Sequence, residues 1–139
     1  GGRKRDPRAP WAVSVVYRCM TDAEALQPHA GKRLEALKWV KVDEAAADGG
    51  LAFDHATLLA EAVREVRTEV EDLRFPPGLL PEPFTLGELQ AASEVVLTKT
   101  LDKSSFRRRL DAAGAVKPVE GAMRTGAFRP AQLFVLAAA

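Results

Sequence analysis

Four prolines between Phe75 and Pro83, in the run FPPGLLPEP, limit the fold of this chain more than any other feature. Proline lacks a backbone N–H and its ring clashes with the preceding helical turn, so no helix can continue through this run. We therefore expect two parts, residues 1–75 and residues 76–139. A length of 139 residues suits one domain or two small ones that share a core.

The part that follows the prolines carries the start and stop signals of two helices. Thr85 and Glu88 are spaced as a capping box, in which each side chain binds the other residue's backbone N–H. A four-residue turn, TKTL, leads to Asp102, which is suited to N-cap a second helix that ends at Gly114. Two β-like runs come next, which predicts a hairpin with its tip near residues 121–126. Helix, turn, helix and hairpin make a winged helix-turn-helix, an α+β arrangement.

The second of these helices has an apolar face and a polar face. At about 100° per residue, Phe106, Leu110 and Ala113 fall on one side and are expected to face the core. The other side presents the hydroxyl and guanidinium groups of Ser104, Ser105 and Arg108. Arginine forks onto guanine and serine either donates or accepts a hydrogen bond, so this face is typical of a helix that reads bases in the major groove.

Basic residues surround this face and are expected to contact the DNA backbone: Lys103, Arg107 and Arg109 on the helix, with Arg124 and Arg129 in the hairpin. Residues 84–136 contain eight lysines and arginines against five acidic residues, a formal charge of +3, whereas the rest of the chain carries −2. This asymmetry suits an anionic partner, and with the helix pair it favours double-stranded DNA. A solvated arginine face, or a winged helix that binds an acidic protein, are the alternatives.

The first part is predicted to hold two strands and a long helix. Residues 11–20 and residues 37–42 are rich in β-branched and aromatic side chains, which favours strands, and DEAAADGG predicts one helical turn and a break. From Asp54 as N-cap, a helix to about Asp72 places apolar residues three and four apart on one face: Leu58, Leu59, Ala62, Val63, Val66, Val70 and Leu73.

This long helix overlaps an imperfect Nudix box, G-x5-E-x7-R-E-U-x-E-E-x-G-U. The residues in register are Gly50, Arg64, Glu65, Val66 and Glu69, but Ala56, Thr68 and Glu71 replace two glutamates and a glycine. The box gathers carboxylates around Mg²⁺, and the two glutamates that remain predict no metal site. No serine, cysteine or histidine arrangement predicts a nucleophile, so we assign no catalytic residue and expect no enzyme activity. Hydrolysis of ADP-ribose or another nucleoside diphosphate derivative is the alternative function.

Composition excludes two further classes of protein. The single cysteine, Cys19, rules out a disulfide framework, and no apolar stretch approaches the roughly 20 residues of a membrane span. We expect a cytoplasmic protein.

With these residues in hand, the chain resembles the Nudix-related transcriptional regulators, bacterial repressors that control NAD metabolism or sugar use. The matching pieces are RDPR at 5–8, VSVVY at 13–17, LAFDH at 51–55, LLPEPFTLGELQ at 79–90, LDKSSFRRRL at 101–110 and FRPAQLF at 128–134. The resemblance implies a Nudix-like domain that senses an ADP-ribose-type ligand, followed by a winged helix that binds DNA as a homodimer. Ser105 stands where relatives often carry asparagine, which bears on base preference.

The resemblance also implies that RDPR lies midway through the Nudix-like domain. Residues 1–75 would then be its C-terminal half, a partial α/β segment with two strands and the long helix, and ligand sensing would be lost or damaged. Two strands are marginal by themselves. We therefore expect this half either to pair with a second copy or to leave an apolar patch exposed. No cofactor is expected in the chain itself.

Overall fold

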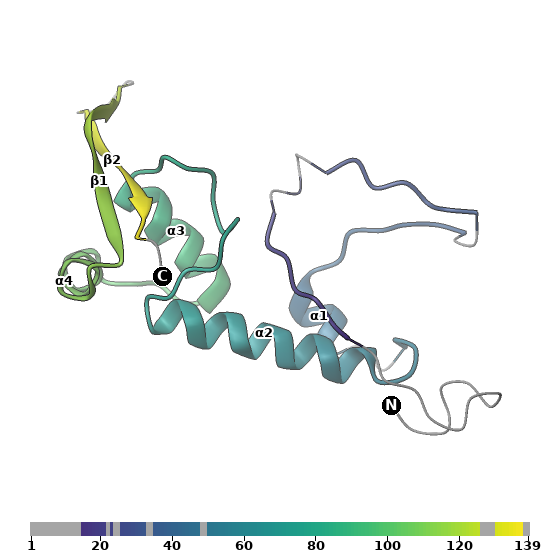
Figure 1. Ribbon diagram of the computed structural model, residues 1–139. Helices are drawn as coiled ribbons and strands as arrows, with labels where there is room; N and C mark the ends of the chain where they lie inside the picture. Colours follow the sequence, from purple (N-terminus) through teal and green to yellow (C-terminus); the bar gives the residue numbers. More distant parts are fainter. Residues whose placement is uncertain are drawn as a thin grey trace. The chain divides into compact units, whose positions relative to one another are not determined.

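The computed structural model of the protein describes residues 15–21, 23, 26–32, 35–47, 50–125 and 130–137. The elements in chain order are α1 (Val42–Ala47), α2 (His55–Glu71), α3 (Leu86–Leu97), α4 (Lys103–Ala113), β1 (Val116–Arg124) and β2 (Ala131–Leu136) (Figure 1). They divide into two compact units, Gly1–Cys19 with Gln27–Glu65, and Met20–Leu26 with Val66–Ala139. Helix α2 contributes residues to both units.

The two strands predicted in the first part are absent from its described residues. Residues 15–20 and 35–41 have no regular secondary structure, and α1 begins at Val42, where the second strand was expected to end. Residues 11–14 of the first predicted strand lie outside the described residues. Both strand predictions are wrong over these ranges, because an extended segment becomes a strand only when its N–H and C=O groups pair with a neighbour. β propensity alone does not supply that neighbour.

Apolar side chains of these two segments are exposed. Tyr17 is 89% exposed and Trp39 is 68% exposed, and Val15, Val16, Leu37 and Val40 are exposed as well. This agrees with the expectation that the first part leaves apolar surface uncovered.

Helix α2 has the extent that its sequence predicted, and its apolar face becomes buried toward the C-terminal end, at Val66 and Val70. The end is closed by two backbone bonds, from Leu73 N to Val70 O at 3.1 Å and from Arg74 N to Glu69 O at 2.8 Å. In this closure Leu73 takes the left-handed conformation, with φ of 59°. That costs a non-glycine residue about 1–3 kcal/mol, which burial of the Leu73 side chain in the core offsets.

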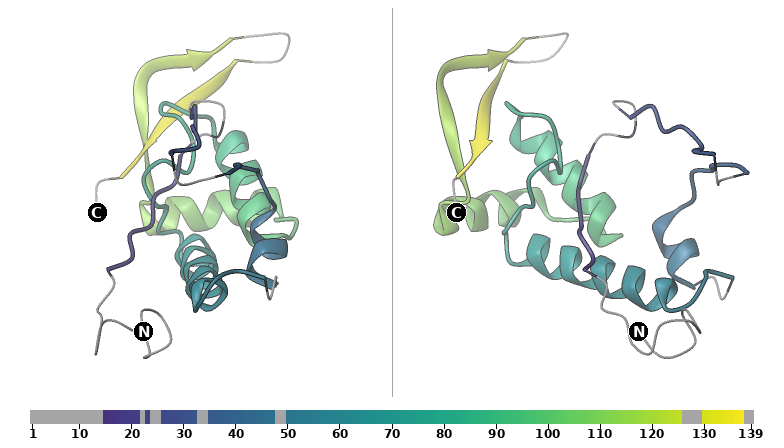
Figure 2. Two further views of the ribbon diagram at one scale, coloured as in Figure 1. Left: turned by 90° about the vertical axis from the view of Figure 1, so that its right-hand side faces the viewer. Right: turned by 45° about the vertical axis from the view of Figure 1, so that its right-hand side comes forward.

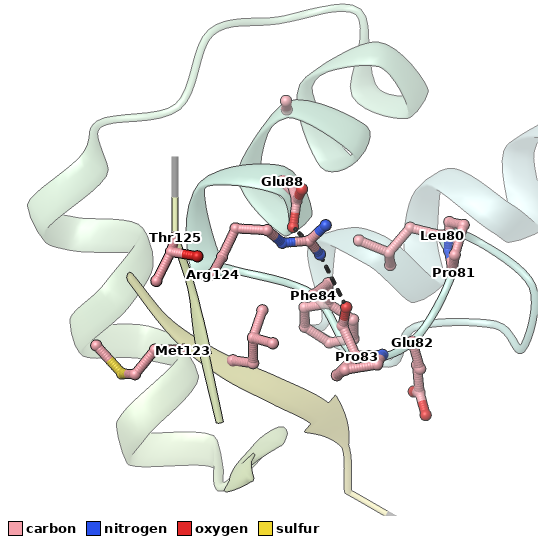
Figure 3. Close-up of a pocket in the computed structure, with 11 residues that line it drawn as sticks. Leu80, Pro81, Glu82, Pro83, Phe84, Glu88, Met123, Arg124 and Thr125 are labelled. Carbon is pink, nitrogen blue, oxygen red and sulfur yellow. Dashed lines mark hydrogen bonds and ion pairs between the residues drawn. The ribbon is translucent and has the colours of Figure 1, made fainter. Parts of the chain in front are cut away.

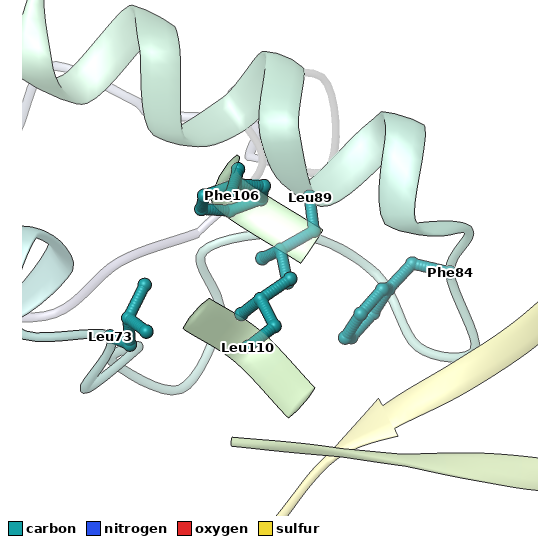
Figure 4. Close-up of a cluster of buried hydrophobic side chains, with 5 residues drawn as sticks. All are labelled: Leu73, Phe84, Leu89, Phe106 and Leu110. Atoms are coloured by element: carbon teal, nitrogen blue, oxygen red, sulfur yellow. The ribbon is translucent and has the colours of Figure 1, made fainter. Parts of the chain in front are cut away.

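The core of the second unit joins α3 and α4 to the chain on either side of the prolines. Its buried members are Leu73, Phe84, Leu89, Phe106 and Leu110 (Figure 4). The prediction that Phe106 and Leu110 anchor α4 is confirmed. Ala113, predicted beside them, is exposed, because α4 ends at this residue and the chain turns away toward β1.

Strands β1 and β2 form the antiparallel hairpin of a wing, which rises from the C-terminal end of α4 (Figure 2). Val116 pairs with Leu136 and Arg124 pairs with Ala131, and the register shifts between Pro118 and Met123. The predicted tip at residues 121–126 is therefore wrong over 121–124, which belong to β1; residues 126–129 lie outside the described residues.

A bulge explains the longer first strand. Gly121 has a φ of 69°, and Gln132 on β2 donates its side-chain N–H groups to Val119 O at 2.7 Å and Ala122 O at 3.0 Å. A side chain thus satisfies carbonyls that the irregular ladder leaves open.

A backbone bridge fastens the segment after the prolines to the wing. Phe84 N donates to Phe134 O at 2.9 Å, and Phe134 N donates to Phe84 O at 2.7 Å. This pairing holds β2 beside the start of α3, and the buried Phe84 ring lies in the core below it.

Candidate nucleic-acid interface

Local caps fix both helices of the helix-turn-helix where the sequence predicted them. The Thr85 side chain accepts from Glu88 N at 3.2 Å, and Glu88 Oε2 accepts from Thr85 N at 2.7 Å, which completes the capping box of α3. Asp102 Oδ1 accepts from Ser105 N at 2.8 Å and caps α4, and Gly114 closes it with φ of 59°. The position of α4 in the chain is therefore set by its own sequence.

The turn between α3 and α4 is held by side chains that sequence reasoning did not single out. Glu94 Oε1 accepts from Leu101 N at 2.8 Å and from Gln90 Nε2 at 3.0 Å, and Gln90 also donates to Leu101 O at 3.0 Å. The bonds from the Gln90 side chain and the Leu101 backbone hold the pKa of Glu94 below its ordinary value. The one available sequence signal was the four-residue spacing of Gln90 and Glu94, on one face of α3.

Most of the residues that were predicted to contact DNA from the outward face of α4 are exposed to solvent. Lys103, Ser104, Arg107 and Arg108 are exposed. Within the described ranges, the side chains of Lys103, Arg107 and Arg108 form no hydrogen bond or ion pair. Ser105 is half-buried next to the Asp102 cap. The face thus offers the exposed hydroxyl of Ser104 and three cationic groups, with Ser105 partly exposed beside them, above a seam buried by Phe106 and Leu110.

Arg109 was predicted to contact a DNA phosphate, but its side chain is bound to the end of α2. Its Nη2 donates to Glu71 O, the backbone carbonyl of the last residue of α2, at 2.5 Å. The structure therefore brings Arg109 to a helix end and does not leave its guanidinium among the open cationic groups of α4.

Arg124 is likewise engaged within the chain. Its Nη2 donates to Pro83 O at 3.1 Å and to Glu88 Oε2 at 3.3 Å, at the wall of a pocket of about 740 Å³ (Figure 3). Glu88 pairs with this guanidinium, so Arg124 adds little net positive charge to the wing. Arg129, the other predicted contact of the hairpin, lies outside the described residues.

Apart from Gly50, the residues of the imperfect Nudix box lie on α2. Glu65, one of its two remaining glutamates, is 3.7 Å from the guanidinium of Arg18. Over the described part of the chain, no group of three or more histidine, cysteine or acidic residues is placed to hold a metal ion. In the same residues no helix is long and apolar enough to cross a membrane.

Residues 76–136 match a family model described as the NrtR DNA-binding winged helix domain. A curated relative, the ADPR responsive transcriptional repressor NtrR of Acinetobacter baylyi, is 37% identical over 134 residues, which are 96% of this chain and 52% of that protein. The chain thus spans about half the length of this relative.

Two solved structures of Shewanella oneidensis NrtR are similar to this chain. The complex with a 27mer DNA matches with a TM-score of 0.58 and 35% identity, over 72% of this chain and 45% of that one. The other crystal structure of this protein matches with a TM-score of 0.57 and 36% identity, over 72% of this chain and 44% of that one. Both structures therefore resemble this chain in fold as well as in sequence.

Proposed function

We propose that this chain, whose residues 76–136 match the NrtR DNA-binding winged helix domain, belongs to that family and is a transcriptional repressor that binds double-stranded DNA. The observation that carries the proposal is the open face of α4, with Ser104 and Arg108 exposed opposite the buried Phe106 and Leu110. The relative from Acinetobacter baylyi, which is named a transcriptional repressor, supports it.

In this proposal α4 enters the major groove with its outward face toward the base edges. Arg108 donates two hydrogen bonds to a guanine, and Ser104 takes a neighbouring base. Lys103 and Arg107, which flank that face, neutralise phosphates on either side of the groove. These contacts account for both the register on the duplex and the choice of sequence.

The parts of the chain have separate roles in the proposal. Residues 1–75 are the C-terminal half of a Nudix-like domain, and residues 76–139 are the winged helix-turn-helix. In the whole protein, the Nudix-like domain senses an ADP-ribose-type ligand, and the repressor controls genes of NAD or sugar metabolism. The relative named ADPR responsive supports this effector. The chain itself is not an enzyme. Release of AMP from ADP-ribose by this chain, dependent on Mg²⁺, would contradict that statement.

A homodimer is also part of the proposal. The exposed side chains of Tyr17 and Trp39 supply apolar surface for association, and a two-fold repressor reads two half-sites. We expect twice the chain mass in size-exclusion chromatography with light scattering. A strict monomer at high concentration would contradict the dimer without affecting the winged helix.

Replacing Lys103 with alanine tests the phosphate contacts. The operator is first selected from random duplexes, and binding is then followed by fluorescence anisotropy at several salt concentrations. Lys103→Ala should weaken binding to all sequences alike and reduce the salt slope by about 1, because one phosphate is no longer neutralised. An unchanged slope and affinity would remove Lys103 from the interface.

A further inference from the structure

We infer that Arg109 is a positioning residue: it fixes the recognition helix α4 on the end of α2 and does not contact DNA. The inference rests on the proposed function and assigns different roles to three consecutive arginines. All three arginines are exposed, but Arg107 and Arg108 have no partner among the described residues, whereas Arg109 donates to Glu71 O at 2.5 Å.

The position of Arg109 on α4 makes this contact possible. At about 100° per residue, Arg109 is about 60° from the buried Phe106, whereas Arg108 is about 160° away from it. Arg109 therefore lies at the border of the buried seam. Its long side chain can reach the rest of the second unit, and that of Arg108 points away from it.

The acceptor is a carbonyl that the closure of α2 leaves open. The two backbone bonds at the end of this helix satisfy the carbonyls of Glu69 and Val70, and Asp72 N donates to Thr68 O at 3.0 Å. The next carbonyl, Glu71 O, receives the guanidinium of Arg109. A cation is favoured there because the C-terminal end of a helix carries partial negative charge.

The same arrangement occurs at the end of α3. Thr98 N donates to Val95 O at 3.4 Å and Lys99 N donates to Glu94 O at 3.3 Å, and the following carbonyl, Val96 O, accepts from Arg67 Nε at 2.9 Å. Each of two helix ends is thus completed by an arginine from another helix. Arg109 connects α4 to the end of α2, and Arg67 connects α2 to the end of α3. The orientation of α4 therefore depends on the Arg109 side chain as well as on apolar packing.

A second contact strengthens the junction at Glu71. Lys99 Nζ lies 2.5 Å from Glu71 Oε1, with both side chains about half exposed. An exposed pair contributes little by itself. It does show that the last residue of α2 is contacted both from the α3–α4 turn and from α4.

The test compares Arg109→Ala with Arg107→Ala in the whole chain, by anisotropy against the selected operator and against a random duplex. A phosphate contact contributes about 0.9 to the salt slope. Arg107→Ala should therefore reduce the slope by about 1. Arg109→Ala should leave the slope unchanged and lower the ratio of operator to random affinity about tenfold, because α4 is no longer aligned with the bases.

Two measurements separate positioning from a purely structural loss. Titrations well below the thermal midpoint of each variant exclude unfolding, which would lower both affinities in parallel. Arg109→Lys retains a cationic donor for one carbonyl, so it should recover most of the operator preference.

A variant-free measurement uses the arginine side-chain ¹⁵N resonances of the wild-type chain, with and without operator. The Arg109 resonance should stay in place when DNA binds, whereas those of Arg107 and Arg108 should shift. Arg109 is shown to contact DNA, and the inference is overturned, if its resonance shifts as much as that of Arg107 or if Arg109→Ala reduces the salt slope. Failure of the wild-type chain to bind any duplex would overturn the proposed function and this inference together.

Discussion

Replacing Leu110 with alanine should lower the free energy of unfolding of the winged helix by about 2–5 kcal/mol. Leu110 is fully buried and joins α4 to Leu89 and Phe84 in the core (Figure 4). Its truncation removes apolar burial and leaves a cavity that a close-packed core only partly fills. Because small domains have a total stability of about 5–15 kcal/mol, this is a large share of it.

Urea unfolding followed by circular dichroism measures this change. Asp111→Ala is a matched control, since Asp111 is the next residue on α4 but is exposed, and its replacement should change stability by no more than about 0.5 kcal/mol. A loss below about 1 kcal/mol for Leu110→Ala would mean that Leu110 is not a core residue and that α4 is packed differently.

Replacing Arg108 with alanine should relax the choice of one base pair by about 1–3 kcal/mol. Arg108 is exposed, carries no ion pair within the described ranges and lies opposite the buried seam. Its loss removes a bidentate contact to guanine, so the operator should lose affinity while duplexes altered at that base pair lose much less. Anisotropy titrations against single-base variants of the operator locate the position.

Arg108→Lys is the matched variant for this prediction. Lysine keeps the charge but not the planar fork, so attraction to phosphates persists while discrimination at the base pair falls. Equal losses on every duplex would place Arg108 on the phosphates and would move base reading to another part of α4.

Much of the second unit could be predicted because its signals are local. The capping box of Thr85 and Glu88, the Asp102 cap and Gly114 each act within a few residues, and the structure has all of them. The separation of buried Phe106 from exposed Arg108 likewise follows from helix geometry alone.

The predictions that were wrong, and the contacts that were not predicted, involve residues far apart in the sequence. The predicted strands at 11–20 and 37–42 need partners, which the sequence pattern of one segment cannot reveal. The bond from Arg109 to Glu71 spans 38 positions, and that from Arg67 to Val96 spans 29. Helix geometry sets Arg109 at the border of the buried seam, but only the bond to Glu71 O shows that its side chain is engaged within the chain.

The wing could also be predicted only in part from local sequence signals. Its glycines and basic residues predicted a hairpin correctly, but the tip was placed too early because the bulge extends β1 to Arg124. The Gln132 side chain stabilises that bulge from the opposite strand, at a separation that turn chemistry does not encode.

Protection of guanine N7 from methylation tests the central claim most directly, because N7 is accessible only in the major groove. With the selected operator, the wild-type chain should protect guanines on the face that α4 contacts, and Arg108→Ala should expose at least one of them at a concentration that still saturates the duplex. Identical protection with both proteins, or no protection of any guanine in the bound duplex, would contradict the placement of α4 in the major groove.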